Sequence, residues 1–241
     1  MTAVERKAVQ QGGMWLIGDT QPQDVFTPED MDSDLKMMGD ATHDFVWKEV
    51  MPKMAALEAK EEGLNAKLLR AAGELGLTAV EIPEEYGGMD LPKAAGILIN
   101  EKLAPTGGFG VTYGAHQSIG TLPIVYYGTP EQKAKYLPKL ATAETIAAYC
   151  LTEPSSGSDA QAAKTSAVLS EDGTHYVLNG TKMWISNAGI AELYTVFAQV
   201  KTSEGNKFSA FLVEKSMPGV SFGGEEHKLG IRSSNTRQVR T

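Results

Sequence analysis

Apolar residues recur at helical spacing through most of the first 140 residues. Thr27-Pro28-Glu29-Asp30 joins an N-cap residue, a proline at the first helical position and acidic first-turn residues, so a helix is expected to begin there. Pro52 is expected to end it, because a proline inside a helix removes a hydrogen bond. The same spacing predicts further helices over residues 64–75, 94–104 and 116–127, and a capping box at Thr129 predicts a short helix to about Leu137. An N-terminal all-α helical bundle over residues 27–145 is therefore predicted.

The first 26 residues carry no such periodicity. Gly12, Gly13 and Pro22 interrupt the pattern, which is typical of irregular chain. We therefore expect residues 1–26 to form an irregular leader, with the apolar run from Met14 to Ile17 pinning it to the body of the protein.

After Thr145 the pattern changes to short runs of β-branched and aromatic residues, which predict strands over residues 147–151, 164–169, 175–178, 182–186, 193–200 and 208–213. Asn179-Gly180 separates two of these runs and is the preferred two-residue loop of a type I′ hairpin. We expect a small antiparallel β-barrel or sandwich over residues 146–241. The predicted fold class is thus an α+β multidomain protein.

Composition adds the broad class: 42% of the residues are hydrophobic and 22% are charged, as in soluble globular proteins. No apolar run approaches the roughly 18 residues that suggest a transmembrane segment, and the N-terminus lacks an apolar signal core. A cytoplasmic protein is expected.

The charge balance argues against nucleic acid as a partner. Lys and Arg total 22 against 30 Asp and Glu, and the net charge of -8 repels phosphate backbones. Cys150 is the only cysteine, which excludes an intrachain disulfide and favours a packing role. The four histidines lack metal-ligand spacing, so we expect no metal site.

Two local segments are candidates for chemistry, whereas no GxGxxG, Walker A, GxSxG or EF-hand pattern occurs. The first, residues 149–159, begins as an apolar strand and breaks at Pro154 into small hydroxyl residues. Such a loop can direct N–H groups and hydroxyls at a heterocycle or phosphate, or simply be a solvated loop. In the second, residues 178–187, Trp184 could pack on a flat cofactor or belong to the core.

Together these segments, YCLTEPSSGSD and LNGTKMWISN, resemble the acyl-CoA dehydrogenase family, most closely its very-long-chain branch. EIPEEYGG and GTPEQKAKYLPKLATAE resemble its helical N-terminal part, and KLGIRSSNTRQV resembles the end of its middle β domain. The resemblance implies FAD-dependent oxidation of an acyl-CoA thioester to the trans-2-enoyl-CoA in fatty acid β-oxidation. A carboxylate takes the α proton while the β hydride passes to the flavin. It also implies an electron-transfer flavoprotein as electron acceptor and a homo-oligomeric parent.

By this resemblance, the FAD-binding residues are Tyr149, Leu151, Thr152, Ser158, Trp184, Ile185 and Ser186. Leu151 is expected to act through its backbone and Thr152 through its hydroxyl, while Trp184 packs beside the ring and Ser186 bonds near N5. Ser158 is also expected to meet the acyl-CoA substrate. Glu153 lies within the motif, but the adjacent Pro154 and the alternation with Thr152 predict that it points away from the ring.

The sequence departs from the family at its end. It stops at Thr241, inside the expected strand QVRT, and the C-terminal helical domain of the family, which carries the catalytic glutamate, is absent. A stop there leaves unpaired backbone groups and an exposed edge, so we expect a truncated form of a longer parent. No catalytic base is expected in this chain, which should bind FAD weakly and show no turnover.

Two alternatives to a dehydrogenase stay open. One is an acyl-CoA oxidase, which is reoxidised by oxygen and usually carries a different motif after the Thr-Glu dipeptide. The other is a non-catalytic binding module that keeps the flavin-domain fold, which the expected absence of the base would fit.

Overall fold

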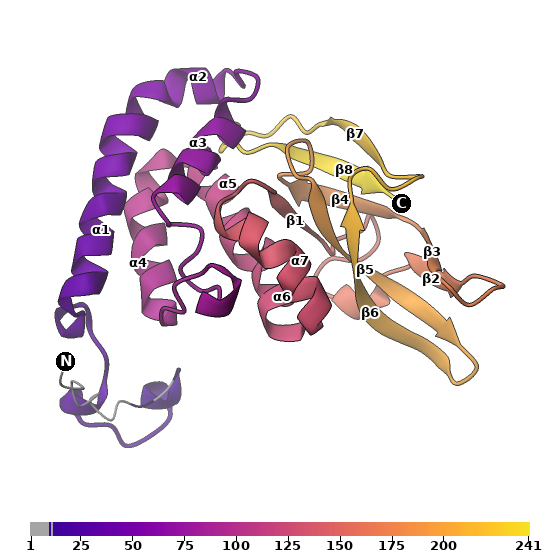
Figure 1. The fold of residues 1–241 in the computed structure, drawn as a ribbon, viewed down its shortest axis with the longest axis horizontal. Coiled ribbons are helices and arrows are strands. Elements are labelled where there is room, and N and C mark those ends of the chain that lie inside the picture. Colours follow the sequence, from indigo (N-terminus) through magenta and orange to yellow (C-terminus); the bar gives the residue numbers. More distant parts are fainter. Residues whose placement is uncertain (1–9, 11) are drawn as a thin grey trace.

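Helices occupy the first part of the chain and strands the second (Figure 1). The computed structural model describes residue 10 and residues 12–241. The last α-helix ends at Ala141 and the first strand begins at Ala147. The predicted fold class, a helical domain followed by a β domain, is confirmed.

The helical part contains seven α-helices within the described residues, joined by short 3-10 and π-helical turns: α1 (Ser33–Phe45), α2 (Met54–Glu58), α3 (Leu64–Glu74), α4 (Lys93–Leu103), α5 (Gly108–Gly114), α6 (Leu122–Tyr127) and α7 (Pro130–Ala141). The glycine-rich helix α5 was not predicted, because glycine is a weak helix former. Packing stabilises it instead: Phe109 and Tyr113 are fully buried, and the Tyr113 hydroxyl donates to the carbonyl of Leu77 at 2.6 Å.

The first long helix begins and ends differently from the prediction. Thr27 caps only a 3-10 turn, Pro28–Asp30, and α1 is capped by Asp32, which accepts a hydrogen bond from the Leu35 N–H at 2.9 Å. Pro52 does not end the helical path. A π-helical turn, Val46–Val50, leads into a 3-10 turn whose first positions tolerate Pro52, since no N–H is needed there.

The capping box at Thr129 is confirmed, with the Gln132 N–H donating to Thr129 Oγ1 at 3.3 Å and the Thr129 N–H donating to Gln132 Oε1 at 2.9 Å. Helix α7 continues past Leu137 to Ala141 with Pro138 inside it. The burial of Leu137 and Leu140 explains the added turn.

The apolar run of the predicted leader does not pack against the body of the protein, contrary to the expectation. Met14, Trp15, Leu16 and Ile17 are all exposed, Ile17 to 83%. The described hydrogen bonds of this segment join residues of the segment to one another. The Gln10 N–H donates to the Asp24 carbonyl and Thr20 Oγ1 donates to Gln10 Oε1, each at 2.8 Å. The part of the prediction that concerns residues 1–9 and 11 lies outside the described residues.

The β part has two sheets built from β1 (Ala147–Cys150), β2 (Ser166–Leu169), β3 (Tyr176–Asn179), β4 (Thr181–Ser186), β5 (Leu193–Thr202), β6 (Gly205–Glu214), β7 (Ser221–Glu225) and β8 (Thr236–Arg240). The smaller sheet, in the order β4-β8-β7, is antiparallel, as expected. The larger sheet is mixed. Strands β1 and β2 both run parallel to β5 along one edge, while β6 pairs antiparallel along the other. The long connections through β2, β3 and β4 allow this parallel pairing.

Asn179-Gly180 is not a hairpin turn. Strand β3 pairs with β2, whereas β4 pairs with β8, so this dipeptide carries the chain from one sheet to the other. Both residues are described, and neither has the positive φ that a type I′ turn requires. Gly180 is needed for close approach, since a Cβ there would overlap the side chain of Thr165. The local turn signal is overridden by pairing with a distant strand.

Strand β8 lies between β4 and β7, so it is not an edge strand. The Gly180 N–H donates to the Thr241 carbonyl at 3.1 Å, and the Thr241 N–H donates to the Gly180 carbonyl at 3.2 Å. The unpaired backbone expected at QVRT is therefore not found.

The two parts share one buried core, in which Leu69 and Phe109 belong to the same cluster as Tyr194 and Val239. His116 joins the parts by hydrogen bonds: its Nδ1 accepts from the Ala147 N–H at 3.1 Å, and its Nε2 donates to the Leu140 carbonyl at 3.0 Å. Complete burial lowers the pKa of His116 to about 4, so the ring is neutral at pH 7. Within the described residues, no helix is both long and apolar enough to cross a membrane.

Candidate functional site

The two sequence segments singled out for chemistry lie side by side in the β part. The first continues from β1 through Leu151 and Thr152, and the second is β4. The Met183 N–H donates to the Thr152 carbonyl at 2.8 Å, which joins the segments directly. Thr152 and Trp184 are thereby placed on neighbouring backbone segments, as the resemblance implied.

The first segment turns sharply after Thr152. Glu153 and Ser156 exchange backbone hydrogen bonds of 2.9 and 3.2 Å around Pro154 and Ser155, forming a tight turn. Ser156 Oγ donates to the Asp159 carbonyl at 2.8 Å, which fixes the following loop. Ser158 is exposed on that loop. The loop is thus an ordered turn whose outer face presents a hydroxyl to solvent.

A buried ion pair ties the two segments together below this turn. Lys182 Nζ lies 2.8 Å from Glu153 Oε1, with side-chain exposures of 0% and 4%. The other carboxylate contacts come from the N–H groups of Lys164 at 2.6 Å and Thr165 at 3.0 Å. Burial by itself would raise the pKa of Glu153, but these donors outweigh it and lower that pKa to about 2. Glu153 therefore points inward as a permanent carboxylate.

Strand β4 carries a β-bulge directly after Lys182. Its register against β8 shifts between Lys182 and Ile185, and Trp184 has a φ of 58°, in the left-handed region that bulky residues rarely adopt. In a regular strand Lys182 and Trp184 would share a face. The bulge instead turns Lys182 and Ile185 inward and leaves Trp184 62% exposed. Strain of this kind is typical of functional sites.

The remaining predicted flavin residues differ in their surroundings. Tyr149 is half-buried with its ring 4.9 Å from that of Phe197, and burial raises the pKa of its hydroxyl. Ile185 is 2% exposed and belongs to the core, so its side chain is not available to a ligand. Ser186 is half-buried and pairs with Thr236 of β8.

Leu151 offers less backbone than expected, because its carbonyl already accepts a hydrogen bond from Lys182 Nζ at 3.1 Å. With the Thr152 carbonyl engaged by Met183, the N–H groups and the Thr152 hydroxyl are the groups that this segment can offer a ligand. Among the described residues, the Thr152 hydroxyl makes no hydrogen bond. An exposed indole and a hydroxyl without a hydrogen bond, on adjacent backbone segments, fit one edge of a flat, polar heterocycle.

Sequence reasoning missed two residues that shape this site. Lys182 was not singled out, although a lysine in an apolar strand together with a glutamate in the other motif is a usable signal for a buried pair. Asn187 is fully buried, and its Nδ2 donates to the Thr112 carbonyl at 2.9 Å. It anchors the end of the second segment to α5.

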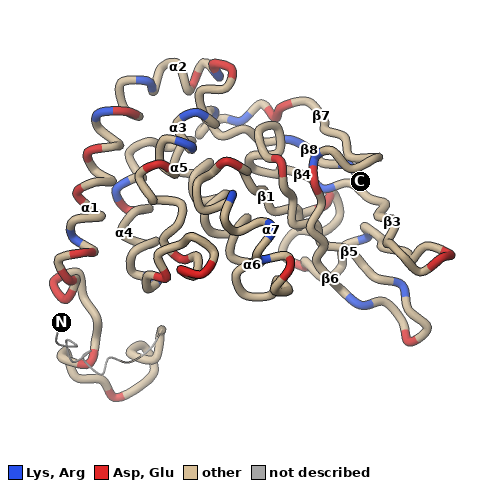
Figure 2. The backbone as a smooth tube through the Cα atoms, in the orientation of Figure 1, with Lys and Arg blue, Asp and Glu red and all other residues tan. Residues whose placement is uncertain are grey.

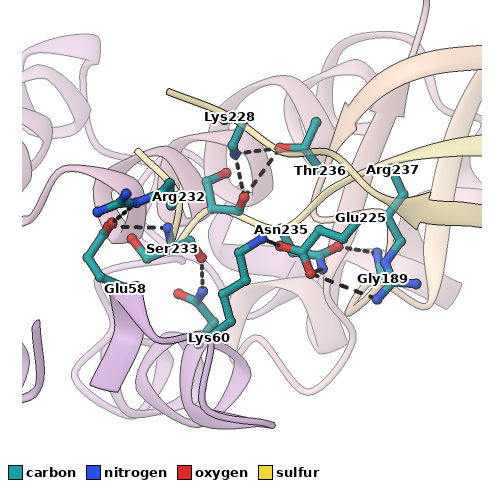
Figure 3. Close-up of polar contacts among 12 residues, drawn as sticks. Glu58, Lys60, Gly189, Glu225, Lys228, Arg232, Ser233, Asn235, Thr236 and Arg237 are labelled. Carbon is teal, nitrogen blue, oxygen red and sulfur yellow. Dashed lines mark hydrogen bonds and ion pairs between the residues drawn. The ribbon is translucent and has the colours of Figure 1, made fainter. Parts of the chain in front are cut away.

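A second polar cluster lies where KLGIRSSNTRQV meets the helices, and Figure 3 shows its contacts. Glu58 of α2 accepts hydrogen bonds from Arg232 Nε at 3.3 Å and from the Ser233 N–H at 3.2 Å. Lys60 Nζ lies 3.0 Å from Glu225 Oε1. We call these four residues and Ser233 the surface network. It links the helical part to β7 and to the segment that joins β7 and β8.

Comparison with known proteins identifies the family of this chain. The profile described as acyl-CoA dehydrogenase, N-terminal domain, matches residues 32–144, and the profile described as acyl-CoA dehydrogenase, middle domain, matches residues 148–241. The chain belongs to the acyl-CoA dehydrogenase family. Both candidate segments lie within the residues matched by the middle domain.

The acyl-CoA dehydrogenase relatives are longer than this chain. A probable acyl-CoA dehydrogenase of Bacillus subtilis is 52% identical over 231 residues, which cover 96% of this chain and 38% of the relative. The human very long-chain specific acyl-CoA dehydrogenase is 47% identical over 173 residues, covering 69% and 26%. A crystal structure of acyl-CoA dehydrogenase from Bacillus anthracis, complexed with FAD, has a TM-score of 0.90 at 51% identity and covers 95% and 39%. The chain spans less than two fifths of each.

Proposed function

We propose that this chain supplies one wall of the flavin site in an FAD-dependent acyl-CoA dehydrogenase. The observation that supports this most directly is the 2.8 Å hydrogen bond from the Met183 N–H to the Thr152 carbonyl, beside which the Trp184 indole is exposed at a strained bulge. The similar Bacillus anthracis enzyme is described as complexed with FAD. A flat isoalloxazine ring matches this pairing of aromatic surface and hydroxyl.

In this proposal the residues of the chain bind and orient the cofactor. Trp184 packs beside the ring, and the hydroxyls of Thr152 and Ser186 donate to its polar edge. Ser158, on the exposed loop, meets the pyrophosphate and the acyl-CoA. When bound, FAD accepts the hydride from the β carbon of the thioester, and the protein tunes that chemistry by its contacts.

The proton of the α carbon needs a base within hydrogen-bond reach, and Glu153 does not supply it. Its carboxylate is 5% exposed, bonded to Lys182 and the Thr165 N–H, and has a pKa of about 2. A general base works best with a pKa near the working pH and with access to the substrate. We propose that the base lies outside both segments, as the family resemblance implies.

Substrate and partners are proposed at the level of the family. The substrate is an acyl-CoA, and the 47% identity to the human very long-chain specific enzyme makes long acyl chains the first to test. An electron-transfer flavoprotein is the proposed electron acceptor, and the parent is proposed to be a homo-oligomer in the cytoplasm.

Equilibrium dialysis against FAD tests the proposal. Trp184→Ala should raise the Kd for FAD about tenfold or more, because stacking on an aromatic side chain contributes roughly 1–3 kcal/mol per base. Trp47→Ala, at a half-exposed tryptophan of the helical part, is the matched control and should leave the Kd unchanged. Equal Kd values for the unmodified protein and Trp184→Ala would contradict the placement of the flavin.

The burial of Glu153 beside Lys182, which removes it as a base, also favours a second candidate, a non-catalytic flavin-binding module. Turnover assays with excess FAD, acyl-CoA and an artificial electron acceptor test this second candidate. We expect the 241-residue chain to act no faster than free FAD. Robust dehydrogenation by this chain would exclude the module and make Glu153 the first residue to replace with Gln.

A further inference from the structure

The Glu153–Lys182 pair is the only ion pair in the described residues whose two side chains are both less than one tenth exposed. Removing two charges from water is costly, and apolar residues of the same size often stabilise a protein as well or better. Stability alone is therefore a weak reason for this pair. Its position between the two flavin segments suggests another.

Lys182 contacts the residues on both sides of Thr152. Lys182 Nζ bonds to the Leu151 carbonyl before Thr152 at 3.1 Å and to Glu153 after it at 2.8 Å. Glu153 in turn accepts from the N–H groups of Lys164 and Thr165, which lead into β2. Every charged group of the pair therefore has partners, a condition for one fixed arrangement.

Lys182 is also the last residue of β4 in regular register with β8 before the bulge. Lys182 and Ile185 are both buried although two residues separate them, so Met183 and Trp184 depart from strand alternation, and Trp184 takes the left-handed backbone conformation. The Met183 N–H is then directed at the Thr152 carbonyl. The ion pair and the bulge thus fix the same two backbone segments against each other.

We propose that Glu153 and Lys182 are positioning residues that hold the Met183–Trp184 bulge and so orient the Trp184 indole and Thr152 toward the flavin. The inference rests on the proposed function for the identity of the ligand, whereas the orientation of Trp184 is measurable without one. A purely structural pair would contribute to folding but leave both Trp184 and flavin affinity unchanged once the fold is retained.

The test uses Trp15→Phe/Trp47→Phe protein, in which Trp184 is the single tryptophan. Glu153→Gln/Lys182→Met removes both charges together and leaves no unpaired buried ion. The matched control is Glu204→Gln/Lys207→Met, the same replacement at an ion pair on the β5–β6 hairpin whose side chains are 78% and 63% exposed. Circular dichroism and thermal melting establish folding, acrylamide quenching reports on Trp184, and equilibrium dialysis gives the Kd for FAD.

We expect the Glu153→Gln/Lys182→Met protein to fold, to show altered acrylamide quenching of Trp184, and to bind FAD about tenfold more weakly, the lower end of the effect known for residues that orient metal ligands. The control should match its parent in both measurements. A folded double variant with unchanged quenching and unchanged Kd would overturn the proposal. If the double variant does not fold, Glu153→Asp, which keeps both charges but withdraws the carboxylate, is judged by the same two measurements.

These results separate the positioning role from the function on which it rests. Altered Trp184 quenching in a series that shows no FAD binding would support the positioning role and contradict the flavin site. Trp184-dependent FAD binding that is equal in parent and double variant would support the flavin site and contradict the positioning role.

Discussion

Two lysine–glutamate pairs in this protein differ chiefly in depth. Lys182 and Glu153 lie in the β part with side chains 0% and 4% exposed, whereas Lys60 and Glu225 of the surface network are 35% and 21% exposed. Figure 2 shows other acidic and basic residues interspersed along α1 and near the tip of the β5–β6 hairpin, and those of α1 are exposed. The same chemistry therefore operates in two dielectric environments.

The difference teaches what each pair can be used for. Near the surface, solvent and salt screen the attraction between the two charges, so an ion pair contributes little to stability and the protein tolerates its loss. In the interior an unpaired charge is so costly that both partners must keep one geometry. The buried pair is suited to fixing a site, and the surface network to linking two parts loosely.

The largest expected effect is that of Lys182→Met alone. This variant leaves the Glu153 carboxylate buried without its cation, which should lower the free energy of unfolding by about 3–5 kcal/mol. Urea denaturation measures it. Adding Glu153→Gln should recover most of the loss, and a single variant as stable as its parent would show that depth does not set the role of this pair.

Lowering the pH should reduce the stability that a second buried polar group, His116, contributes. Its folded pKa of about 4 lies below the usual 6.5, so the unfolded state binds the proton first as the pH falls. Stability from this group is present above pH 6.5 and is lost as the pH falls toward 4, by up to about 3 kcal/mol. Urea denaturation at several pH values checks the slope.

His116→Asn is the control for that slope, because an amide does not titrate. Carboxylates shared by both proteins also titrate in acid, so the relevant quantity is the difference between the two stability curves. Parallel curves between pH 4 and 6.5 would show that burial does not lower the pKa of His116.

A smaller effect, of opposite sign, is expected at the bulge. Trp184→Asn replaces a bulky residue at φ 58° with one that tolerates the left-handed region, and should stabilise the protein by about 0.5–1 kcal/mol. The same change should weaken FAD binding. Thermal melting and dialysis together test whether the strain serves the ligand; a destabilised variant would mean that packing of the indole outweighs the strain.

The smallest effect is expected at the surface network. Lys60→Met makes the same chemical change as Lys182→Met but at a partly exposed pair, and should cost about 1 kcal/mol or less. Raising the salt concentration should shrink that cost further, whereas it should hardly alter the cost of Lys182→Met. Equal losses of unfolding free energy at the two sites would contradict the idea that burial determines what each pair contributes.

Local signals in the sequence predicted much of this fold. The capping box at Thr129 and the apolar spacing of α3 depend on residues within a few positions of one another, and both were confirmed. The strands that became β5 and β6 were also recognised from β-branched and aromatic runs. Such features can be predicted from the sequence because neighbouring residues alone determine them.

Elsewhere the prediction from local sequence was wrong or incomplete, because contacts between distant residues determine the structure. Asn179-Gly180 has the local chemistry of a hairpin, but pairing of β4 with β8 removes the turn. The candidate site was located by its motifs, yet the inward turn of Lys182 and the core position of Ile185 follow from a bulge that only the register with β8 determines. A strand pattern read in isolation cannot show where its alternation is broken.

The most direct test of the account is time-resolved fluorescence of Trp184 during titration with FAD. In Trp15→Phe/Trp47→Phe protein, we expect a saturable shortening of the tryptophan lifetime, because the flavin would lie against the indole. In Trp15→Phe/Trp184→Phe protein, where Trp47 is the single tryptophan, the lifetime should not change. Saturable quenching of Trp47 and not of Trp184, or no saturable quenching of either, would contradict the claim that these two segments form a flavin wall.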